Sequence, residues 1–469
     1  MSKSKHKREK ARGKLQPQVP TDAGRRKFLA LGLGGLGTVA ASVFVGYKFG
    51  WFGSDLAASS SSPQASPTPN LATGKPLLPV SLPANYQNAL LAGEEIVKHY
   101  ARELNNPSAL IHAVRAFGKN FSLNDGTKAV DFLCSRYAVE REVNGKRYVS
   151  FPREAEVHDN SFLKTMLEAG ISPDQPIIAG GKKYTLRELG ENARALFRCD
   201  PQNFQRFDLQ LLYQHLPWCL IAFSILLPPA KSTWVNAYGD TIILPDVIDR
   251  GLAAFESSCS GVRDLIARHE EEPLQFRQEM AKYSCSGMHM AYGFFSCLNH
   301  SYRNNDLSER LRELFDSLIY RLQGDAEAIE RETQAARRSG QEYIYKMGIG
   351  PDGKPMTKGS PPPEAIEVMG LRHQIRMLGH GLEAINYAQL HRIFTLNPEQ
   401  KRRLQAGEQL LYENIIKMRA TNLEPFMFWY GKFVSDIVVA LAHAVRAMKL
   451  LTPDNPDTIA LNRSSGIES

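Results

Sequence analysis

YSCSGMHMAYGFFSCLNHSY, residues 283–302, is the segment that decides the fold. It is apolar almost throughout, yet His289, Tyr292, Ser296 and His300 follow one another at offsets of three, seven and eleven from the first, which aligns them along one side of a helix. A buried helix with a single polar line is typical of the wall of a cavity.

Three further segments have the same character, residues 207–227, 371–393 and 433–451. Between and beside them lie amphipathic, heavily charged stretches at 307–339 and 398–418, which suit outer helices. Together these patterns predict an all-α fold, an α/α toroid of helical hairpins. We also expect an N-terminal signal or anchor helix and a few short strands.

An internal repeat supports this interpretation. Residues 181–189, GKKYTLREL, recur as residues 239–247, GDTIILPDV. Each unit reads as a turn, an outer amphipathic helix and then a more apolar helix, and helix pairs that repeat at this length form solenoids or closed toroids. Before residue 180, the clearest strand signal is a hairpin at 143–151 around Asn144 and Gly145.

The N-terminal segment GRRKFLA, residues 24–30, resembles a twin-arginine export signal, with Arg25, Arg26, Phe28 and Leu29 as the motif residues. An uncharged run with five glycines, residues 28–47, follows, as in the apolar region of such signals. The alternative is a signal anchor, because about 20 apolar residues suffice to cross a bilayer. Either way we expect an exported chain, which is periplasmic or is anchored to the cytoplasmic membrane and faces the periplasm. The expected partner is the twin-arginine export machinery. If the signal is not cleaved, residues 28–47 also contact the membrane.

These features divide the chain into five parts. They are a basic region with the twin-arginine motif (1–27), the apolar region or membrane anchor (28–47), a Ser/Pro-rich linker (54–83), the α/α-toroid domain (84–455) and a disordered tail (456–469).

The charge is concentrated at the N-terminus. Residues 1–27 hold ten Lys or Arg and two acidic residues, and this net of +8 equals the charge of the whole chain. The domain itself is therefore neutral, and we expect no nucleic acid as a partner. The six cysteines contain no C-x-x-C pair, which argues against a structural zinc site and favours buried free thiols.

The polar lines suggest acid and base chemistry. His380 and Glu383 are three residues apart and share a helix face. If the protein is catalytic, we expect His289 and His380 to act as acid and base, Glu383 to orient His380, and Trp218 and Tyr292 to contact the substrate.

Two further residues, His443 and Asp436, are candidates for ligand binding. The alternative is structural, because a histidine on an apolar helix is more often a hydrogen-bonded core residue. An enzyme should leave an open cavity beside its histidines, whereas a scaffold should fill the hole with apolar side chains, namely Met288, Met290, Phe294 and Phe295.

A metal site is not predicted, because no H-E-x-x-H motif is present and ligands would have to come from different helices, such as His289, His380 and His443. The cofactor is unknown.

Three short motifs carry a resemblance. Residues 285–289 (CSGMH), residues 379–383 (GHGLE) and His443 are similar to motifs of exported bacterial proteins with a terpene-cyclase-like, six-hairpin α/α toroid and no established activity. Those proteins usually show Cys-Gly-Gly-Thr-His at the first motif, where this chain has Ser286 and Met288. The second motif also resembles one in sugar epimerases built on an (α/α)6 barrel. Prenyl cyclisation is disfavoured, since the chain lacks D-D-x-x-D and D-x-D-D.

The signal or anchor, the Ser/Pro-rich linker and the expected toroid together predict an envelope protein whose cavity binds an extended or sugar-like ligand, a glycan or lipid-like molecule, with acid/base chemistry if it is an enzyme. The alternative is a noncatalytic helical scaffold or interaction protein of the cell envelope.

Overall fold

The computed structural model describes residues 85–104, 106–199, 211–268, 280, 282–303, 306–339, 361–450 and 452. This part of the chain is mostly helical, with 70% helix in 13 helices, as expected. The helices are α2 (Tyr86–Leu104), α3 (Pro107–Phe117), α4 (Ala129–Arg136), α5 (Ser161–Glu168), α6 (Leu186–Leu196), α8 (Leu216–Leu226), α9 (Leu244–Arg268), α11 (Met288–Asn299), α12 (Leu307–Ser339), α14 (Ala365–Leu390), α15 (Pro398–Arg419), α16 (Glu424–Trp429) and α17 (Gly431–Lys449).

Three antiparallel hairpins are present in the described ranges. They are β1 (Val139–Val143) with β2 (Lys146–Ser150), β3 (Pro176–Ala179) with β4 (Lys182–Thr185), and β5 (Thr233–Val235) with β6 (Thr241–Ile243). The first is the predicted hairpin, and Asn144 and Gly145 both have positive φ, as its tight turn requires. The second hairpin has no counterpart in the sequence-based expectation, because each of its strands has only four residues.

The internal repeat corresponds to a repeated structural unit. In each copy a hairpin leads directly into a helix, β4 into α6 and β6 into α9. Thr185 caps α6 in a capping box with Glu188, and Asp246 lies in the first turn of α9, where its negative charge suits the positive helix end. The two copies are linked where the indole of Trp234 donates a hydrogen bond to the carbonyl of Arg194.

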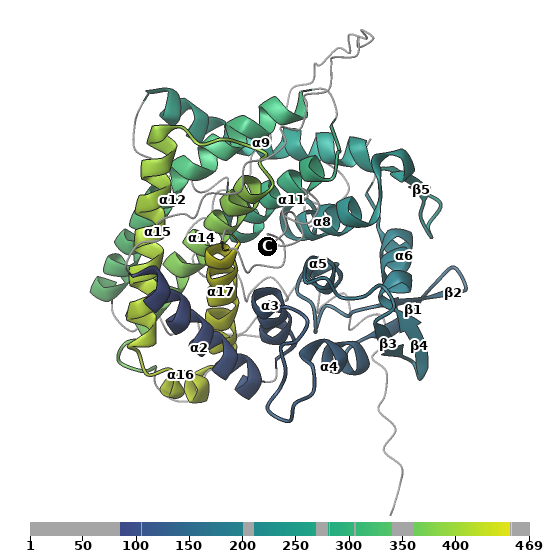
Figure 1. Ribbon diagram of the computed structural model, residues 1–469, viewed down its shortest axis with the longest axis horizontal. Helices are drawn as coiled ribbons and strands as arrows, with labels where there is room; N and C mark the ends of the chain where they lie inside the picture. The colour runs from purple at the N-terminus through teal and green to yellow at the C-terminus, as the bar shows by residue number, and fades with distance from the viewer. Residues whose placement is uncertain are drawn as a thin grey trace, which may run out of the picture.

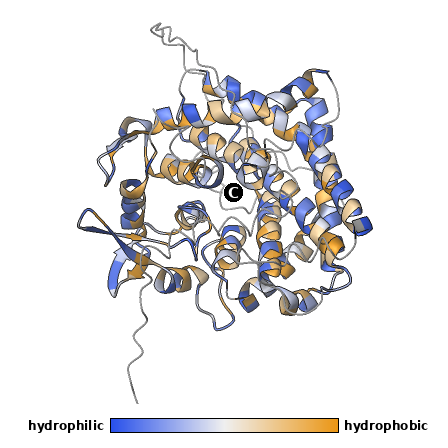
Figure 2. Cartoon of the chain, turned by 180° about the vertical axis from the view of Figure 1, so that it is seen from behind, coloured by the Kyte–Doolittle hydropathy of each residue, from blue (hydrophilic) through white to orange (hydrophobic). Residues whose placement is uncertain are grey.

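Six helices surround the centre of the molecule, and each contacts the next (Figure 1). The order of contact is α3, α5, α8, α11, α14 and α17, and α17 in turn contacts α3. Among the peripheral helices, α2, α12 and α15 pack against this inner set. Hydrophilic residues predominate on the outward faces of the peripheral helices (Figure 2).

The inner helices pack closely because of two glycines. A Cβ on Gly293 of α11 would lie 3.2 Å from the carbonyl oxygen of Pro217 on α8, and one on Gly379 of α14 would lie 3.0 Å from the backbone nitrogen of Ala444 on α17. The fully buried Phe294 and Phe295 join α11 to the peripheral helices, since Phe294 contacts Phe255 of α9 and Phe295 contacts Phe315 of α12. Burial of each phenylalanine side chain stabilises the fold by roughly 1.5–3 kcal/mol.

Two of the predicted inner helices start later than expected. The segment 283–302 forms a 3-10 turn, η6 (Ser284–Gly287), and becomes α-helical only at Met288. His300 is the C-cap of that helix rather than part of its polar line. In the segment 207–227, a π-helical turn, η3 (Leu211–His215), precedes α8, which has proline near its start.

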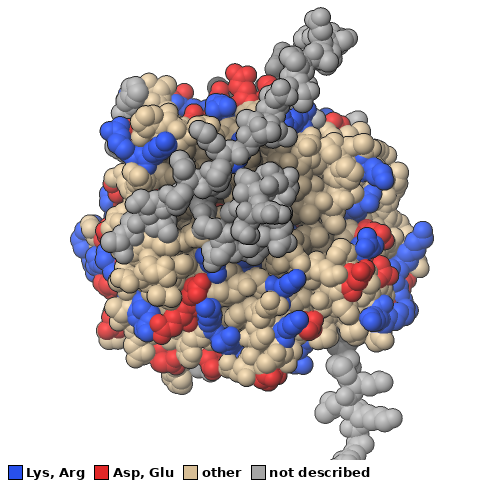
Figure 3. Space-filling model, viewed as in Figure 1, with Lys and Arg blue, Asp and Glu red and all other residues tan. Residues whose placement is uncertain are grey.

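Charged side chains of both signs are interspersed over the face of the molecule seen in Figure 3. No helix within the described ranges is both long enough and apolar enough to cross a bilayer. The predicted signal motif (Arg25, Arg26, Phe28 and Leu29), residues 28–47, the linker 54–83 and the tail 456–469 lie outside the described residues.

Candidate active site

The site begins with the turn that precedes α11. Cys285, Ser286 and Gly287 have φ values of 49°, 51° and 82°, so three successive residues adopt the left-handed region. Cys285 and Ser286 are not glycines, and positive φ is uncommon in such residues. It costs of the order of 1 kcal/mol or more for each of them. The turn takes Cys285 out of the α-helix and leaves it at the amino end of α11, partly exposed.

Gly287→Ala should destabilise the protein by at least about 2 kcal/mol, because a methyl group there meets both backbone strain and a clash. Its Cβ would lie 2.4 Å from Cε2 of Phe255. Gly145→Ala is the matched control, since Gly145 also has positive φ but nothing within 4 Å. Urea unfolding of both variants measures the difference, and equal losses would show that the Phe255 contact is unimportant.

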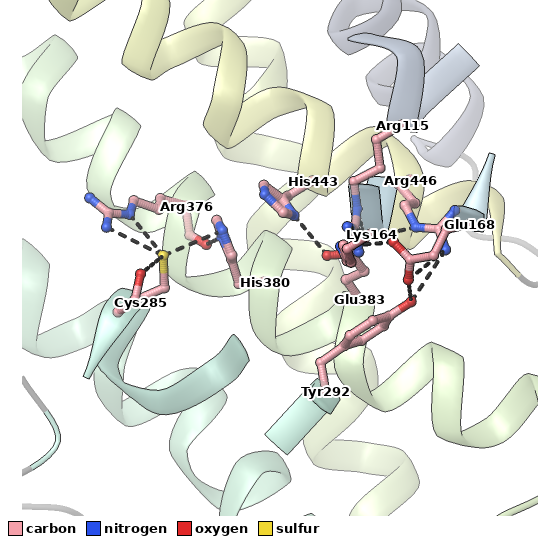
Figure 4. A network of polar contacts seen from close by, with 11 residues as sticks. Arg115, Lys164, Glu168, Cys285, Tyr292, Arg376, His380, Glu383, His443 and Arg446 are labelled. Atoms are coloured by element: carbon pink, nitrogen blue, oxygen red, sulfur yellow. Dashed lines mark hydrogen bonds and ion pairs between the residues drawn. The ribbon is translucent and has the colours of Figure 1, made fainter. Parts of the chain in front are cut away.

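The thiol of Cys285 faces two side chains of α14 (Figure 4). Its Sγ lies 3.4 Å from Nε2 of His380. Arg376 donates to the same sulfur from two nitrogens, at 3.4 Å from Nε and 3.3 Å from Nη2. Since Arg376 and His380 are four residues apart on one helix, they meet the sulfur from the same face.

The ring orientation of His380 is fixed by its own helix. Its Nδ1 lies 2.5 Å from the carbonyl oxygen of Arg376. A carbonyl only accepts, so Nδ1 carries the hydrogen, and in the neutral ring Nε2 presents its lone pair to Cys285. Glu383, which we expected to orient His380, accepts a hydrogen bond from Nδ1 of His443 at 2.7 Å, and His443 in turn stacks on His380.

The surroundings of Cys285 make its thiol acidic. Burial raises its pKa, but the charges of Arg376 and His380 and their hydrogen bonds outweigh this and lower the pKa to about 6. Other cysteines behave in the opposite way: burial raises the pKa of Cys134 to about 12 and also raises those of Cys219 and Cys297. Cys285 is thus mostly thiolate at neutral pH.

Aromatic rings form a continuous row beside the thiol. The ring of His380 stacks on His443 with centroids 3.8 Å apart and meets His289 edge-on at 4.5 Å. Trp218 lies 4.5 Å from His289 and stacks on His158 at 3.7 Å. Burial lowers the pKa of His289 and of His443 well below the usual value, and lowers that of His158 to about 3, which keeps these rings neutral.

A buried ion network supports this row from the other side (Figure 4). Glu383 binds Arg115 at 2.8 Å and Arg446 at 2.9 Å. Arg115 continues to Glu168 at 2.8 Å. Glu168 also binds Lys164 at 2.8 Å.

The hydroxyl of Tyr292 completes the network by donating to Glu168. Burial and the charge of Glu168 raise the pKa of Tyr292 well above its usual value, so the phenol stays protonated. Burial alone would raise the pKa of Glu383, but Arg115 and Arg446 outweigh it and hold the pKa below its usual value.

Most of the predicted site residues come together. His289, His380, Glu383, Trp218, Tyr292 and His443 belong to the ring row and the ion network. Asp436 differs: its side chain is 41% exposed and pairs with Arg372 at 3.1 Å.

The residues missed by sequence reasoning include Cys285, Arg376, Arg115, Lys164 and Glu168. For Cys285 a signal was present, since it is the first residue of the CSGMH motif, but it was grouped with the buried cysteines. Arg376 lies one helical turn before His380, a spacing that could have drawn attention to it.

The accessibility of the row is mixed. The side chains of His289, His380 and His443 are only 2–5% exposed. Met288, Met290, Phe294 and Phe295 are also buried, and the two phenylalanines contact Phe255 of α9 and Phe315 of α12. Cys285 and Arg376 remain partly exposed. Two cavities, one lined by residues such as Ile329 and Met369 and one beside the β1–β2 hairpin, do not include the predicted site residues.

Among the described residues, one set of side chains could hold a metal ion. Cys285, His289 and His380 each offer one ligand atom, and these three atoms lie within 4.8 Å of one another.

Comparison with known protein families, curated proteins and solved structures finds no match for this chain.

Proposed function

We propose that the protein is an enzyme in which Cys285 acts as a nucleophile and His380 as its acid and base. The observation that carries this proposal is the contact of the Cys285 thiol with Nε2 of His380 and two nitrogens of Arg376. A thiolate is the reactive form of cysteine, and an adjacent base with a fixed orientation is the usual way to produce it.

The reaction class that fits best is acyl transfer. Nε2 of His380 first takes the proton of the Cys285 thiol, which leaves a thiolate beside an imidazolium. The thiolate attacks a carbonyl carbon, and the bond from that carbon to the leaving oxygen or nitrogen breaks as Nε2–H of His380 gives that proton to the leaving group. A thioester on Cys285 results. Water or another acceptor then attacks, His380 takes its proton, and the carbon–sulfur bond breaks to restore the thiolate. Arg376 and the amino end of α11 stabilise negative charge beside the sulfur.

The proposed scaffold is an α/α toroid. The closed cycle of contacts through α3, α5, α8, α11, α14 and α17, with peripheral helices packed outside it, supports this architecture. An extended or sugar-like ligand suits a site at the centre of such a ring. The N-terminal sequence supports export, so the proposed place of action is the cell envelope.

The alternative is a noncatalytic scaffold, and the observation that favours it is the burial of the histidine rings and the closed ion network. In that case the ring row stabilises the helices and Cys285 has no covalent role.

A small activated ester distinguishes the two. With p-nitrophenyl acetate, the wild-type domain should release a burst of one equivalent of p-nitrophenol per chain and carry an acetyl group on Cys285, detected by peptide mass mapping. Cys285→Ser should lose both, whereas Cys134→Ala, which removes a buried thiol of raised pKa, should keep them. Release without a burst and without acetylated Cys285 would contradict the nucleophile and favour the scaffold.

A further inference from the structure

One residue of the ring row has no role in the nucleophile mechanism. His289 lies against His380, 4.5 Å between ring centroids, and no described residue forms a hydrogen bond with its ring nitrogens. Its ring is 5% exposed. Imidazole is the commonest metal-binding side chain, and His289 lies beside a thiol and a second imidazole.

The ligand atoms around it have the spacing of a metal site. The sulfur of Cys285 and Nε2 of His380 are 3.4 Å apart, and all three ligand atoms, including that of His289, lie within 4.8 Å of one another. In tetrahedral zinc sites the metal lies about 2.3 Å from sulfur and about 2.0–2.1 Å from nitrogen. Ligand atoms bound to one ion are then about 3.3–3.7 Å apart, so only small side-chain movements are required.

The hydrogen bonding of His380 and the types of ligand atom also suit a metal ion. Nδ1 of His380 donates to the carbonyl of Arg376, which leaves Nε2 available, and a carbonyl on the second ring nitrogen is the usual support of a metal-binding histidine. One thiolate and two imidazoles favour zinc and similar soft divalent ions over magnesium or calcium.

We infer that Cys285, His289 and His380 bind one zinc-class divalent ion, and that this binding blocks the nucleophile. The second half of the inference rests on the proposed function, because the metal would occupy the sulfur and the imidazole nitrogen that covalent chemistry needs. Three protein ligands leave a fourth position open to water or to an anion. The positive charge of Arg376 beside the sulfur opposes a dication, so the ion should be removable by a chelator.

The test measures metal binding and thiol protection together. Metal-free domain is titrated with Zn²⁺ by calorimetry and with Co²⁺ by absorption, and alkylation of Cys285 by iodoacetamide is followed with and without Zn²⁺. We expect one ion per chain, a thiolate-to-cobalt charge-transfer band, and at least tenfold slower alkylation with Zn²⁺ that EDTA reverses.

Variants assign the ligands. His289→Phe keeps an aromatic ring but removes its nitrogens, and it should weaken Zn²⁺ binding at least tenfold. Zn²⁺ should also no longer slow the alkylation of Cys285 in this variant, compared with the alkylation rate of the same variant without metal. His300→Phe, at the other end of α11, is the matched control and should keep both. No binding by wild type, or binding that His289→Phe leaves unaltered, would overturn the site.

The two proposals fail separately. If the ester acetylates Cys285 but the protein binds no Zn²⁺, the metal inference alone is overturned. Zn²⁺ binding with no acetylation of the metal-free domain would overturn the nucleophile, and with it the inhibitory role, while leaving the metal site in place.

Discussion

Glu383→Gln is expected to lower the free energy of unfolding by about 3–5 kcal/mol, because it leaves two buried guanidinium groups without their shared carboxylate. Arg115 and Arg446 both bind Oε1 of Glu383, and all three side chains are almost fully buried. His443 also loses its acceptor. Denaturant unfolding followed by circular dichroism measures the loss.

Glu142→Gln is the matched control, since Glu142 is exposed on β1, and its effect should stay within about 0.5 kcal/mol. A similar small effect at Glu383 would show that the network adds nothing to stability.

Acidification provides a second readout if Glu383→Gln does not fold. The pKa of Glu383 is lower in the folded protein than its usual value. Its contribution is therefore present above the unfolded pKa of about 4.3 and is lost as the pH falls through the lower folded value. Wild-type stability should decline in that acidic window.

The helical architecture could be predicted because its signals are local. Residues 307–339 show helical periodicity along their whole length, and α12 has those bounds. The Asn144 and Gly145 turn is equally local, since it needs positive φ at two successive residues. The short strands β3 and β4 could not be predicted, because four residues each carry too little periodic pattern.

The site was predictable only in part. Polar residues on apolar helices identified His289, His380, Glu383 and His443, which do meet. Their partners could not be read from the sequence: Arg115 is more than 250 residues away from Glu383 along the chain and meets it only through packing of α3 near α14. The acidity of Cys285 was also hidden, because it depends on a left-handed turn that no periodic pattern encodes.

For Cys285 as a thiolate nucleophile, the pH dependence of its reactivity follows from its neighbours. Those neighbours are Arg376 and His380 on α14 and His289 on α11, with Asp436 of α17 acting on Arg376 from further away. Below the thiol pKa of about 6 the sulfur is protonated and slow, and above it the reactive thiolate predominates. An opposite charge at this distance usually lowers a pKa by about 1–3 units.

Arg376→Met removes that charge while keeping an unbranched side chain. The midpoint pH of the alkylation rate of Cys285 should rise by at least about one unit. Alkylation at pH 6 should slow several-fold to about tenfold, because less of the thiol is ionised. Arg331→Met is the control, since Arg331 is exposed on α12.

The most direct measurement is the alkylation rate of Cys285 in the metal-free wild-type domain, followed by peptide mass mapping between pH 4.5 and 9.5. A midpoint near pH 6, shifted upward by Arg376→Met but not by Arg331→Met, is the result expected for the thiolate nucleophile. A midpoint near the ordinary cysteine value of about 8.5 in wild type would contradict it.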